Sequence, residues 1–362
     1  MSLPPGIARW LSTETRYLEL PDPLPLESGD VVEEPVVAYR TWGRLNRDGT
    51  NAVLVCHALT GSADADDWWA GMLGPGRALD PERDFIVCSN VLGGCYGSSG
   101  PLSPTPDGGR RQGGDFPRVT VRDMVHLQRR LLDALGVGRL ALVIGPSLGG
   151  MQVLEWAACY PDRVDAIAPI GVSARHSAWC IGISEAQRQA IWRDPLWREG
   201  HYPDDAPPRQ GMSVARMIAM VSYRSWDNFE SRFGRDKANP DLFQVESYLR
   251  YQGDKLVDRF DAAAYVRLTQ AMDSHDLGRG RGELEAVLAG MRQPALVVSV
   301  SSDVLYPPAE QRYLADHLPN ARYEVLDTPH GHDGFLIDLE ALGELVREFR
   351  GGLAAPRALA AG

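Results

Sequence analysis

The stretch GPSLGGMQVLEW, residues 145–156, places a serine between glycines where an apolar run ends and a helical pattern begins. The preceding residues LALVI are continuously apolar, which predicts a strand covered on both faces. The following residues MQVLEWAACY predict a helix that ends at Pro161. Ser147 is therefore expected in a tight turn from a strand into a helix, where neighbouring glycines allow the backbone to pack closely.

Similar apolar runs recur along the chain, with helix-like stretches between several of them. They are NAVLVC, DFIVCSN, VDAIAPIG and PALVVSV. Continuous rather than alternating apolar runs are typical of a mostly parallel sheet. The stretch TVRDMVHLQRRLLDALG also places Met124, Leu127, Leu131 and Leu135 on one helical face before Gly136. The sequence therefore predicts the α/β fold class.

The pattern changes between about residues 174 and 292, which are rich in Arg, Gln, Trp and Met and contain helical segments such as SVARMIAMVSYRSW. Strand signals return at PALVVSV and YEVLD, followed by the amphipathic stretch LEALGELVREF. We therefore predict one α/β domain, formed by residues 1–173 and 293–362, that is interrupted by a helical insertion over residues 174–292.

The composition of the chain argues against some classes of binding partner. The 362 residues carry a formal net charge of −11, which argues against nucleic acid or an anionic membrane as the main partner. The chain has no basic N-terminal stretch before a long apolar core and no run of about 18 apolar residues, so we expect a cytoplasmic protein.

The five cysteines form no CxxC pair, and three lie in apolar runs, which predicts buried reduced thiols. The sequence contains no cluster with metal-ligand spacing and no GxGxxG fingerprint. We therefore expect neither a metal nor a dinucleotide cofactor.

A serine nucleophile needs a histidine base and an orienting carboxylate, here expected in the chain order Ser, Asp, His. Asp303 directly follows the predicted strand PALVVSV, and TPHGHDGFL supplies His330 and His332 after the strand YEVLD. Position favours His332 only modestly. Each residue alone has an ordinary structural explanation, as a turn serine, a capping aspartate or a solvated histidine, but the three in this order predict a triad of Ser147, Asp303 and His332.

Two backbone N–H groups are expected to hold the oxyanion that such a reaction forms. The first belongs to Leu148, at the N-terminus of the helix after the serine. The second should come from the loop after an earlier strand, where HALTG supplies Leu59. His57 lies beside the predicted strand end, and we expect it to be structural.

These segments together resemble the homoserine O-acyltransferases of the α/β-hydrolase superfamily. The motifs AYRTWG, HALTG, NVLGGCYGSSGP, DFPRVTVRDMV, GPSLGGMQVLEWA, ISEAQRQAI, VARMIAMVSYRS, SSDVLYPP and GHDGFL follow the family's order over nearly the whole chain. NVLGGCxGSxGP and GGMQxLEWA are far more specific than GxSxG alone. The resemblance implies the α/β-hydrolase fold, with a mostly parallel central sheet and the insertion as a helical lid.

The resemblance also implies residue roles. It selects His332 over His330, because the family's histidine lies within GHDxF. The implied roles are Ser147 as nucleophile, Asp303 as orienting carboxylate, His332 as base, and Leu59 and Leu148 as oxyanion donors.

The family further implies that Arg216 and Asp333 recognise homoserine, whose carboxylate needs a cation and whose ammonium group needs an anion. Without the resemblance, Arg216 would be interpreted as a solvated helix residue. Arg224, two helical turns further along, is the reserve candidate.

The implied activity is transfer of an acetyl group from acetyl-CoA to the hydroxyl of L-homoserine, for methionine synthesis, by a ping-pong mechanism. Acetyl-CoA is then a substrate rather than a cofactor, and the lid helices are expected to form a homodimer. Succinyl-CoA is the alternative donor and would need an extra cation near the acyl pocket, for which Arg175, Arg188 and Arg193 are available. Serine is a less favoured acceptor, because HALTG resembles the homoserine-using members.

A plain serine esterase and a catalytically inactive scaffold remain open alternatives. Haloalkane dehalogenation is disfavoured, because that chemistry on this fold uses an aspartate where Ser147 stands.

Overall fold

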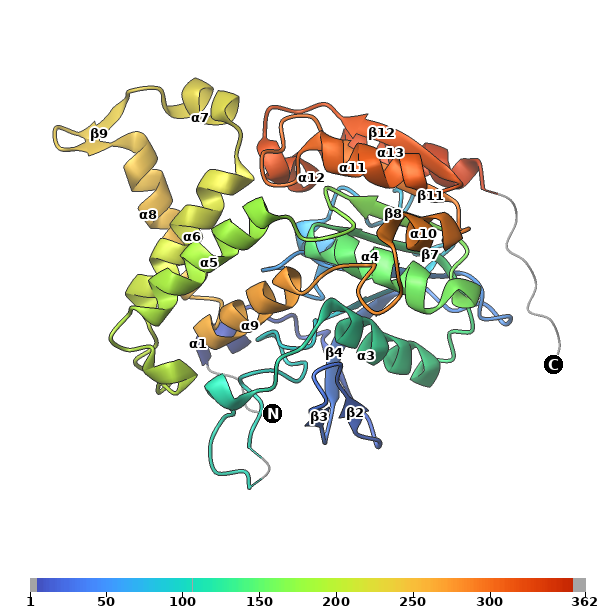
Figure 1. The fold of residues 1–362 in the computed structure, drawn as a ribbon, viewed down its shortest axis with the longest axis horizontal. Helices are drawn as coiled ribbons and strands as arrows, with labels where there is room; N and C mark the ends of the chain where they lie inside the picture. The colour runs from blue at the N-terminus through green and yellow to red at the C-terminus, as the bar shows by residue number, and fades with distance from the viewer. Residues whose placement is uncertain (1–4, 106, 354–362) are drawn as a thin grey trace.

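The computed structural model describes residues 5–105 and 107–353, and its framework is an eight-stranded sheet (Figure 1). The strand order is β1-β4-β6-β5-β7-β8-β11-β12. The bounds are β1 Arg16–Glu19, β4 Val36–Trp42, β5 Ala52–Val55, β6 Phe85–Ser89, β7 Leu140–Pro146, β8 Ile167–Ile170, β11 Ala295–Val300 and β12 Ala321–Leu326. β4 pairs antiparallel with both β1 and β6, and the other strand pairs of this sheet are parallel, so the predicted mostly parallel sheet is confirmed.

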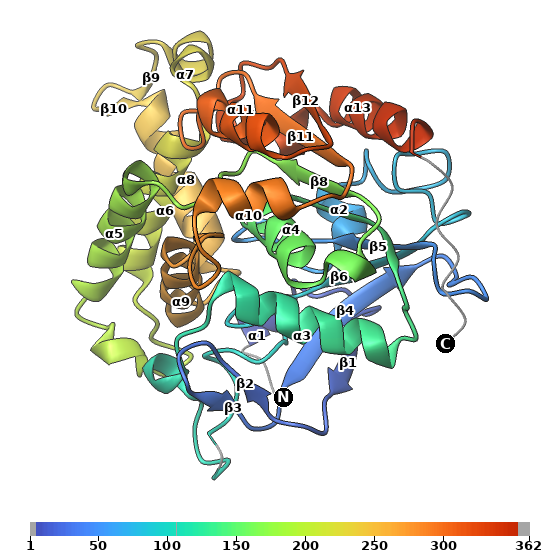
Figure 2. The same cartoon turned by 45° about the vertical axis from the view of Figure 1, so that its right-hand side comes forward.

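Helices cover both faces of the sheet, as the continuous apolar strands require. In β7, Val143 belongs to one core cluster, whereas Leu142 and Ile144 belong to the cluster on the opposite face. The first cluster includes α3 and α4, and the second includes α13 (Figure 2). The predicted apolar face of α3 is confirmed, because Met124 and Leu131 are fully buried within the first cluster.

The other elements connect these layers. The α-helices are α1 Pro5–Ala8, α2 Ala65–Trp68, α3 Val121–Ala134, α4 Leu148–Cys159, α5 Ala178–Trp192, α6 Arg209–Tyr223, α7 Trp226–Phe233, α8 Gln244–Val257, α9 Ala262–Asp273, α10 Leu284–Gly290, α11 Pro308–His317, α12 Gly334–Ile337 and α13 Leu339–Gly351. The 3-10 helices are η1 Gly113–Asp115, η2 Pro161–Arg163, η3 Arg198–Gly200 and η4 Gly331–Asp333. Two small hairpins pair β2 Leu24–Pro25 with β3 Val31–Val32, and β9 Lys237–Asn239 with β10 Leu242–Phe243.

Helices α5–α9, between β8 and β11, form a separate group beside the sheet, coloured from green through yellow to orange in Figure 1. Within it, α6 packs against α5 and α8, and α5 packs against α9. The last helix before β11, α10, instead packs against α11 next to the sheet. We call α5–α9 the lid below. The domain boundaries at 174 and 292 stay predictions, and residues 354–362 of the predicted α/β domain lie outside the described residues.

The helix predicted from SVARMIAMVSYRSW is divided into two. Helix α6 ends at Tyr223, and α7 begins at Trp226. Ser225 starts the new helix, because its Oγ accepts a hydrogen bond from the Asn228 N–H at 3.0 Å. Such N-caps interrupt an apolar pattern without disturbing its periodicity, which is why the pattern alone predicted one segment.

The cysteines agree with the prediction of buried reduced thiols. All five are free, and only Cys159 is partly exposed. None of the helices in the described part of the chain is long and apolar enough to cross a membrane.

Candidate active site

Ser147 lies in a strained turn between β7 and α4, as the sequence predicted. Its φ of 56° and ψ of −122° are unusual for a residue with a side chain. The flanking glycines make the turn possible, because a Cβ on Gly149 would lie 2.0 Å from the Cys56 carbonyl oxygen, and one on Gly145 would lie 2.5 Å from it. The end of β5 thus packs directly against the turn, and Ser147 is held at the carboxyl edge of the sheet.

Asp303 and His332 form a buried pair at the same edge. Nδ1 of His332 lies 2.6 Å from Oδ2 of Asp303, and the two residues are 2% and 3% exposed. The other carboxylate oxygen accepts the N–H groups of Leu305 and Tyr306, at 2.8 and 2.9 Å. These bonds fix the carboxylate, so that Oδ2 faces the imidazole and holds its Nδ1–H.

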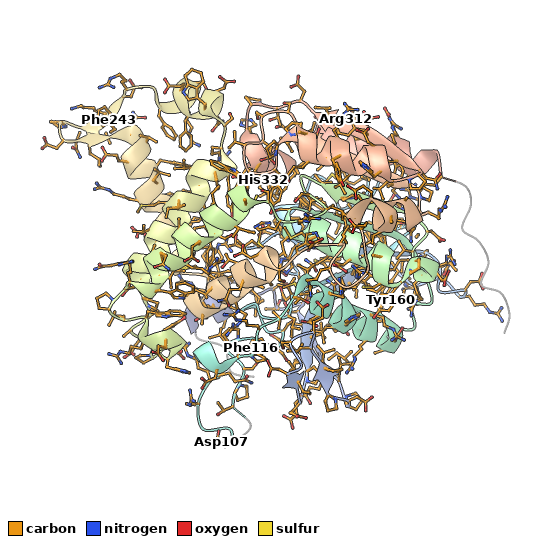
Figure 3. The ribbon with its side chains drawn as sticks, viewed as in Figure 1. Asp107, Phe116, Tyr160, Phe243, Arg312 and His332 are labelled. Carbon is orange, nitrogen blue, oxygen red and sulfur yellow. The ribbon has the colours of Figure 1, made fainter. Side chains whose placement is uncertain are left out.

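The backbone of β8 places Ser147 beside this pair. The Ser147 N–H donates to the Ile170 carbonyl at 2.9 Å, and a Cβ on the next residue, Gly171, would lie 3.6 Å from Cε1 of His332. The Nε2 atom of His332 is buried and has no hydrogen-bond partner among the described residues. With Nδ1 donating to Asp303, Nε2 is the basic nitrogen and is free to accept the proton of the Ser147 hydroxyl. Figure 3 labels His332 where the lid meets the α/β part.

The two neighbouring histidines have different surroundings. His330 Nδ1 lies 3.0 Å from Nδ2 of Asn228, on α7 of the lid. His332 instead packs against Tyr306 and Phe335, with ring centroids 5.2 and 5.0 Å away. The structure thus brings His332, and not His330, to Asp303.

The two predicted oxyanion donors follow neighbouring strands, β5 and β7. Leu148 is the first residue of α4, and Leu59 lies in the loop after β5. In the described part of the chain, neither N–H donates a backbone hydrogen bond, so both are free for a ligand.

His57 holds the oxyanion loop in place. Its Nε2 accepts the Val91 N–H at 3.3 Å, and its Nδ1 lies 2.8 Å from the Ala58 carbonyl oxygen. Burial lowers the pKa of His57 to about 4, so the ring stays neutral near pH 7. The structural role predicted for His57 agrees with these contacts.

The predicted homoserine-binding residues meet where α6 packs against η4. Asp333 lies directly after His332 and forms a 3.1 Å ion pair with Arg224. Burial raises the pKa of Asp333, although the charges of Arg224 and Arg216 oppose this effect. Arg216 also lies near, with its Cζ 5.5 Å from the centre of the Tyr223 ring, and its buried Nε has no hydrogen-bond partner among the residues that the structure describes.

Sequence reasoning ranked Arg216 above Arg224, whereas the structure gives Arg224 the direct contact with Asp333. The close approach depends on Gly331, where a Cβ would lie 2.7 Å from the backbone of Arg224 and Ser225. The glycine in GHDGF was the available signal for this contact. The aromatic rings around His332 left no comparable signal in the sequence.

In the described residues, no group of three or more His, Cys, Asp or Glu side chains is arranged to hold a metal ion. The reactive groups at the carboxyl edge of the sheet are a serine at a strained turn, a histidine oriented by an aspartate, and two backbone N–H groups without a backbone acceptor among the described residues. This arrangement is suited to acyl transfer through a serine ester.

Comparison with known proteins points the same way. The family model for the α/β-hydrolase fold matches residues 51–338. The chain is 57% identical over 342 residues to a homoserine O-acetyltransferase of Trichormus variabilis, covering 94% of this chain and 95% of that protein.

Solved structures resemble the whole molecule. A homoserine O-acetyltransferase from Bacillus anthracis superposes with a TM-score of 0.88 at 24% identity, covering 95% of this chain and 99% of that one, which supports the fold alone. Esterase E22 superposes with a TM-score of 0.86 at 26% identity, covering 93% of this chain and 99% of that one.

Proposed function

The chain belongs to the homoserine O-acetyltransferase family of α/β hydrolases, and from this premise we propose how its residues transfer an acetyl group from acetyl-CoA to L-homoserine. The activity is acyl transfer, as in the relatives that share more than half of its residues. The buried His332–Asp303 pair beside the strained serine is the single observation that supports the mechanism most strongly.

The succinyl alternative is not favoured. The relatives are named acetyltransferases, and two of the three arginines considered for a succinyl carboxylate already have carboxylate partners. Arg188 pairs with Asp273 at 2.6 Å, and Arg175 pairs with Asp276 at 3.0 Å. The free carboxylate of a succinyl group would have to compete with Asp273 and Asp276 for these two arginines.

In the first half-reaction, His332 removes the proton of Ser147 as Oγ attacks the thioester carbon. The N–H groups of Leu59 and Leu148 hold the oxyanion of the tetrahedral intermediate. The carbon–sulfur bond then breaks, and His332 returns the proton to the sulfur, so CoA leaves as the thiol. An acetyl ester remains on Ser147.

In the second half-reaction, Asp333 binds the ammonium group of homoserine, while Arg216 binds its carboxylate. His332 takes the proton of the homoserine hydroxyl as that oxygen attacks the ester. When the bond to Ser147 breaks, His332 gives the proton back to Oγ, and O-acetylhomoserine leaves.

Water competes with homoserine for the acetyl-enzyme, and the similar fold of esterase E22 makes hydrolysis the second candidate activity. Each tenfold preference for homoserine requires about 1.4 kcal/mol of barrier difference. The near-complete burial of the triad and the charged pair at Asp333 support the transferase, because they limit water and position an amino acid.

We expect thiol release from acetyl-CoA to depend on homoserine, with parallel lines in double-reciprocal plots when both substrates are varied. Parallel lines follow because CoA leaves before homoserine reacts. The measurement is initial-rate thiol detection with acetyl-CoA and with succinyl-CoA, each with and without homoserine. A rate of thiol release that does not depend on homoserine would indicate a hydrolase. A higher rate with succinyl-CoA than with acetyl-CoA would identify succinyl-CoA as the donor.

Asp333→Asn is expected to lower kcat/KM for homoserine by about 10–100-fold, the effect of losing one charge-assisted hydrogen bond. Formation of the acetyl-enzyme in a single turnover should be nearly unchanged, because acetyl-CoA does not use this carboxylate. Glu340→Gln, at an exposed acid on α13, is the control. An equal loss in both half-reactions would contradict a role in acceptor binding.

The pH profile provides a second readout of Asp333. Because its pKa is raised, the carboxylate takes up a proton at a higher pH than an exposed aspartate, and homoserine binding should weaken there on acidification. His332 serves both half-reactions, so the rate of the homoserine half-reaction divided by the rate of the acetyl-CoA half-reaction isolates this effect. The ratio should fall at low pH in the natural enzyme and stay flat in Asp333→Asn.

The homodimer and the cytoplasmic location belong to the same proposal. Exposed apolar side chains on the lid support a dimer through these helices, and among them are Val214, Val221, Trp226 and Tyr251. The five free cysteines fit a reducing compartment.

A further inference from the structure

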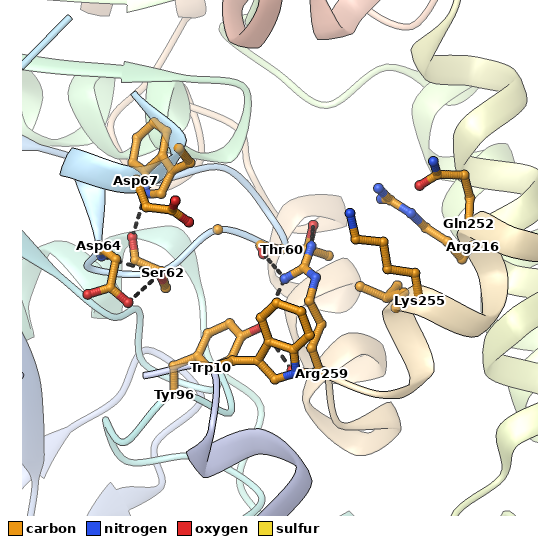
Figure 4. A pocket seen from close by; sticks show the side chains of 13 residues that line it. Trp10, Thr60, Ser62, Asp64, Asp67, Tyr96, Arg216, Gln252, Lys255 and Arg259 are labelled. Atoms are coloured by element: carbon orange, nitrogen blue, oxygen red, sulfur yellow. Dashed lines mark hydrogen bonds between the residues drawn. The ribbon is translucent and has the colours of Figure 1, made fainter. Parts of the chain in front are cut away.

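A cavity of about 270 Å³ lies between the lid and the loop that follows β5 (Figure 4). One wall begins at Thr60, directly after the proposed oxyanion donor Leu59. The opposite wall comes from the lid and includes Arg216, Lys255 and Arg259. The cavity is therefore next to the site where the acetyl group is transferred.

The lid wall of this cavity carries positive charge without carboxylate partners. Lys255 and Arg259 stand four residues apart, and neither they nor Arg216 form a salt bridge to any residue that the structure describes. The Arg259 guanidinium donates to three uncharged acceptors, which are the Thr60 carbonyl and the Tyr96 hydroxyl, both at 2.8 Å, and the Thr60 hydroxyl at 3.4 Å. These bonds orient Arg259 and leave its charge uncompensated.

The acidic residues of the cavity do not neutralise this wall. Figure 4 shows Asp64 and Asp67 on the far side from Lys255 and Arg216. Asp64 already has a cationic partner, because Arg40 lies 3.0 Å from its carboxylate. The lid side of the cavity is thus suited to an anion.

We propose that Lys255 and Arg259 bind the phosphate groups of the acyl-CoA donor, an inference that rests on the proposed function. CoA carries its phosphates at the far end of a long uncharged arm from the thioester. With the thioester at Leu59 and Ser147, an arm that leaves past Thr60 enters this cavity. Arg216, the proposed partner of the homoserine carboxylate, marks the end of the cavity towards the acceptor, whereas Asp333, the proposed partner of its ammonium group, does not line the cavity.

The chain contains a natural control for this proposal. Its only two lysines are Lys237 and Lys255. Lys237 lies in the β9–β10 hairpin, where Nζ donates to the Pro240 carbonyl at 2.7 Å and lies 5.3 Å from the centre of the Phe243 ring. Phe243, labelled in Figure 3, marks this hairpin at the outer end of the lid, well away from His332.

The kinetic test compares donors that keep or lack phosphate. Lys255→Met should raise KM for acetyl-CoA about tenfold, as expected for one charge-assisted contact, and leave kcat and the homoserine KM unchanged. With S-acetylpantetheine, which has no phosphate, the same variant should behave like the natural enzyme. Lys255→Arg should restore the acetyl-CoA KM, and Lys237→Met should have no effect.

Acetyl-3′-dephospho-CoA identifies the phosphate involved. If the Lys255→Met effect persists with this donor, the lysine contacts the diphosphate; if it disappears, the lysine contacts the 3′-phosphate. Both results support the proposal. An unchanged KM for acetyl-CoA in Lys255→Met, or an equal loss with S-acetylpantetheine, would overturn it.

A binding measurement separates this inference from the proposed activity. Reductive methylation with ¹³C-formaldehyde labels the two lysines and the terminal amine, and the Lys237→Arg and Lys255→Arg variants assign the lysine signals. Added CoA should shift the Lys255 signal and leave Lys237 unchanged, while pantetheine should shift neither. If thiol release is independent of homoserine but CoA still shifts the Lys255 signal, only the assignment of homoserine as acceptor fails. If CoA leaves the Lys255 signal unchanged, the proposed phosphate site is wrong.

Discussion

Ser147→Ala is expected to lower kcat for acetyl transfer by about 10⁶-fold, the scale at which loss of a serine nucleophile removes covalent catalysis. The reason is geometric as well as chemical. The strained turn presents Ser147 alone at the carboxyl edge of the sheet, beside a histidine whose Nε2 has no other partner among the described residues. Initial-rate thiol release with acetyl-CoA and homoserine measures the loss.

Mass spectrometry of the protein after rapid mixing with acetyl-CoA alone provides the matching readout. The natural enzyme should gain one acetyl group on Ser147, and Ser147→Ala should gain none. Ser231→Ala, at an exposed serine of the lid helix α7, is the control and should acetylate normally. Substantial homoserine acetylation by Ser147→Ala would mean that the acetyl group passes directly between the substrates, and the ping-pong scheme would be wrong.

Asp303→Asn is expected to lower kcat by about 10⁴-fold, as for other triads in which an amide replaces the orienting carboxylate. The asparagine Oδ1 can still accept the N–H groups of Leu305 and Tyr306, so the loop should keep its shape. Its NH₂ group then faces Nδ1 of His332 and favours the tautomer with the proton on Nε2. In that tautomer the imidazole cannot accept the proton of Ser147.

The control is Asp327→Asn, at an exposed aspartate whose carboxylate accepts only the hydroxyl of Ser301 among the described residues. Thermal unfolding of both variants shows whether the loop has been damaged. If Asp303→Asn folds normally and retains more than about a tenth of the activity, Asp303 is not the residue that orients His332.

Much of the fold could be predicted because the buried strands carry their own signal. The apolar runs of the sequence coincide with β5, β6, β7, β8 and β11, and the strand signal YEVLD overlaps β12. β1 and β4 were missed. β1 has no continuous apolar run, and in β4 the apolar residues 36–39 are followed by Arg40 and Thr41. β1 pairs only with β4, and three of its four residues are exposed. A strand with few buried residues is determined by its neighbour more than by its own sequence.

The site residues likewise fall into those that the sequence predicted and those that depend on tertiary packing. The triad candidates follow strands, so chain order was sufficient to select Ser147 and Asp303, and the GHDGF motif selected His332. The ion pair of Arg224 with Asp333 joins residues more than a hundred positions apart, and it depends on how α6 packs against η4. The cationic wall with Lys255 and Arg259 likewise exists only after the lid folds over the β5 loop. A local sequence pattern does not predict such packing between segments that are distant in the chain.

The chain leaves the sheet at the end of β8 and returns at β11, two strands that are direct neighbours, with Val298 opposite Ile170. Because the two strands are parallel, the intervening stretch leaves at the carboxyl edge of the sheet and returns to its amino edge. Helix α10 makes this return beside α11, whereas the lid helices α5–α9 lie beside the sheet and pack on one another. The lid can therefore change during evolution while Ser147, Asp303 and His332 keep their positions. The helices α5–α9, residues 178–273, moved between this enzyme and an esterase of the same fold without α10, are thus the natural unit for recombining specificity.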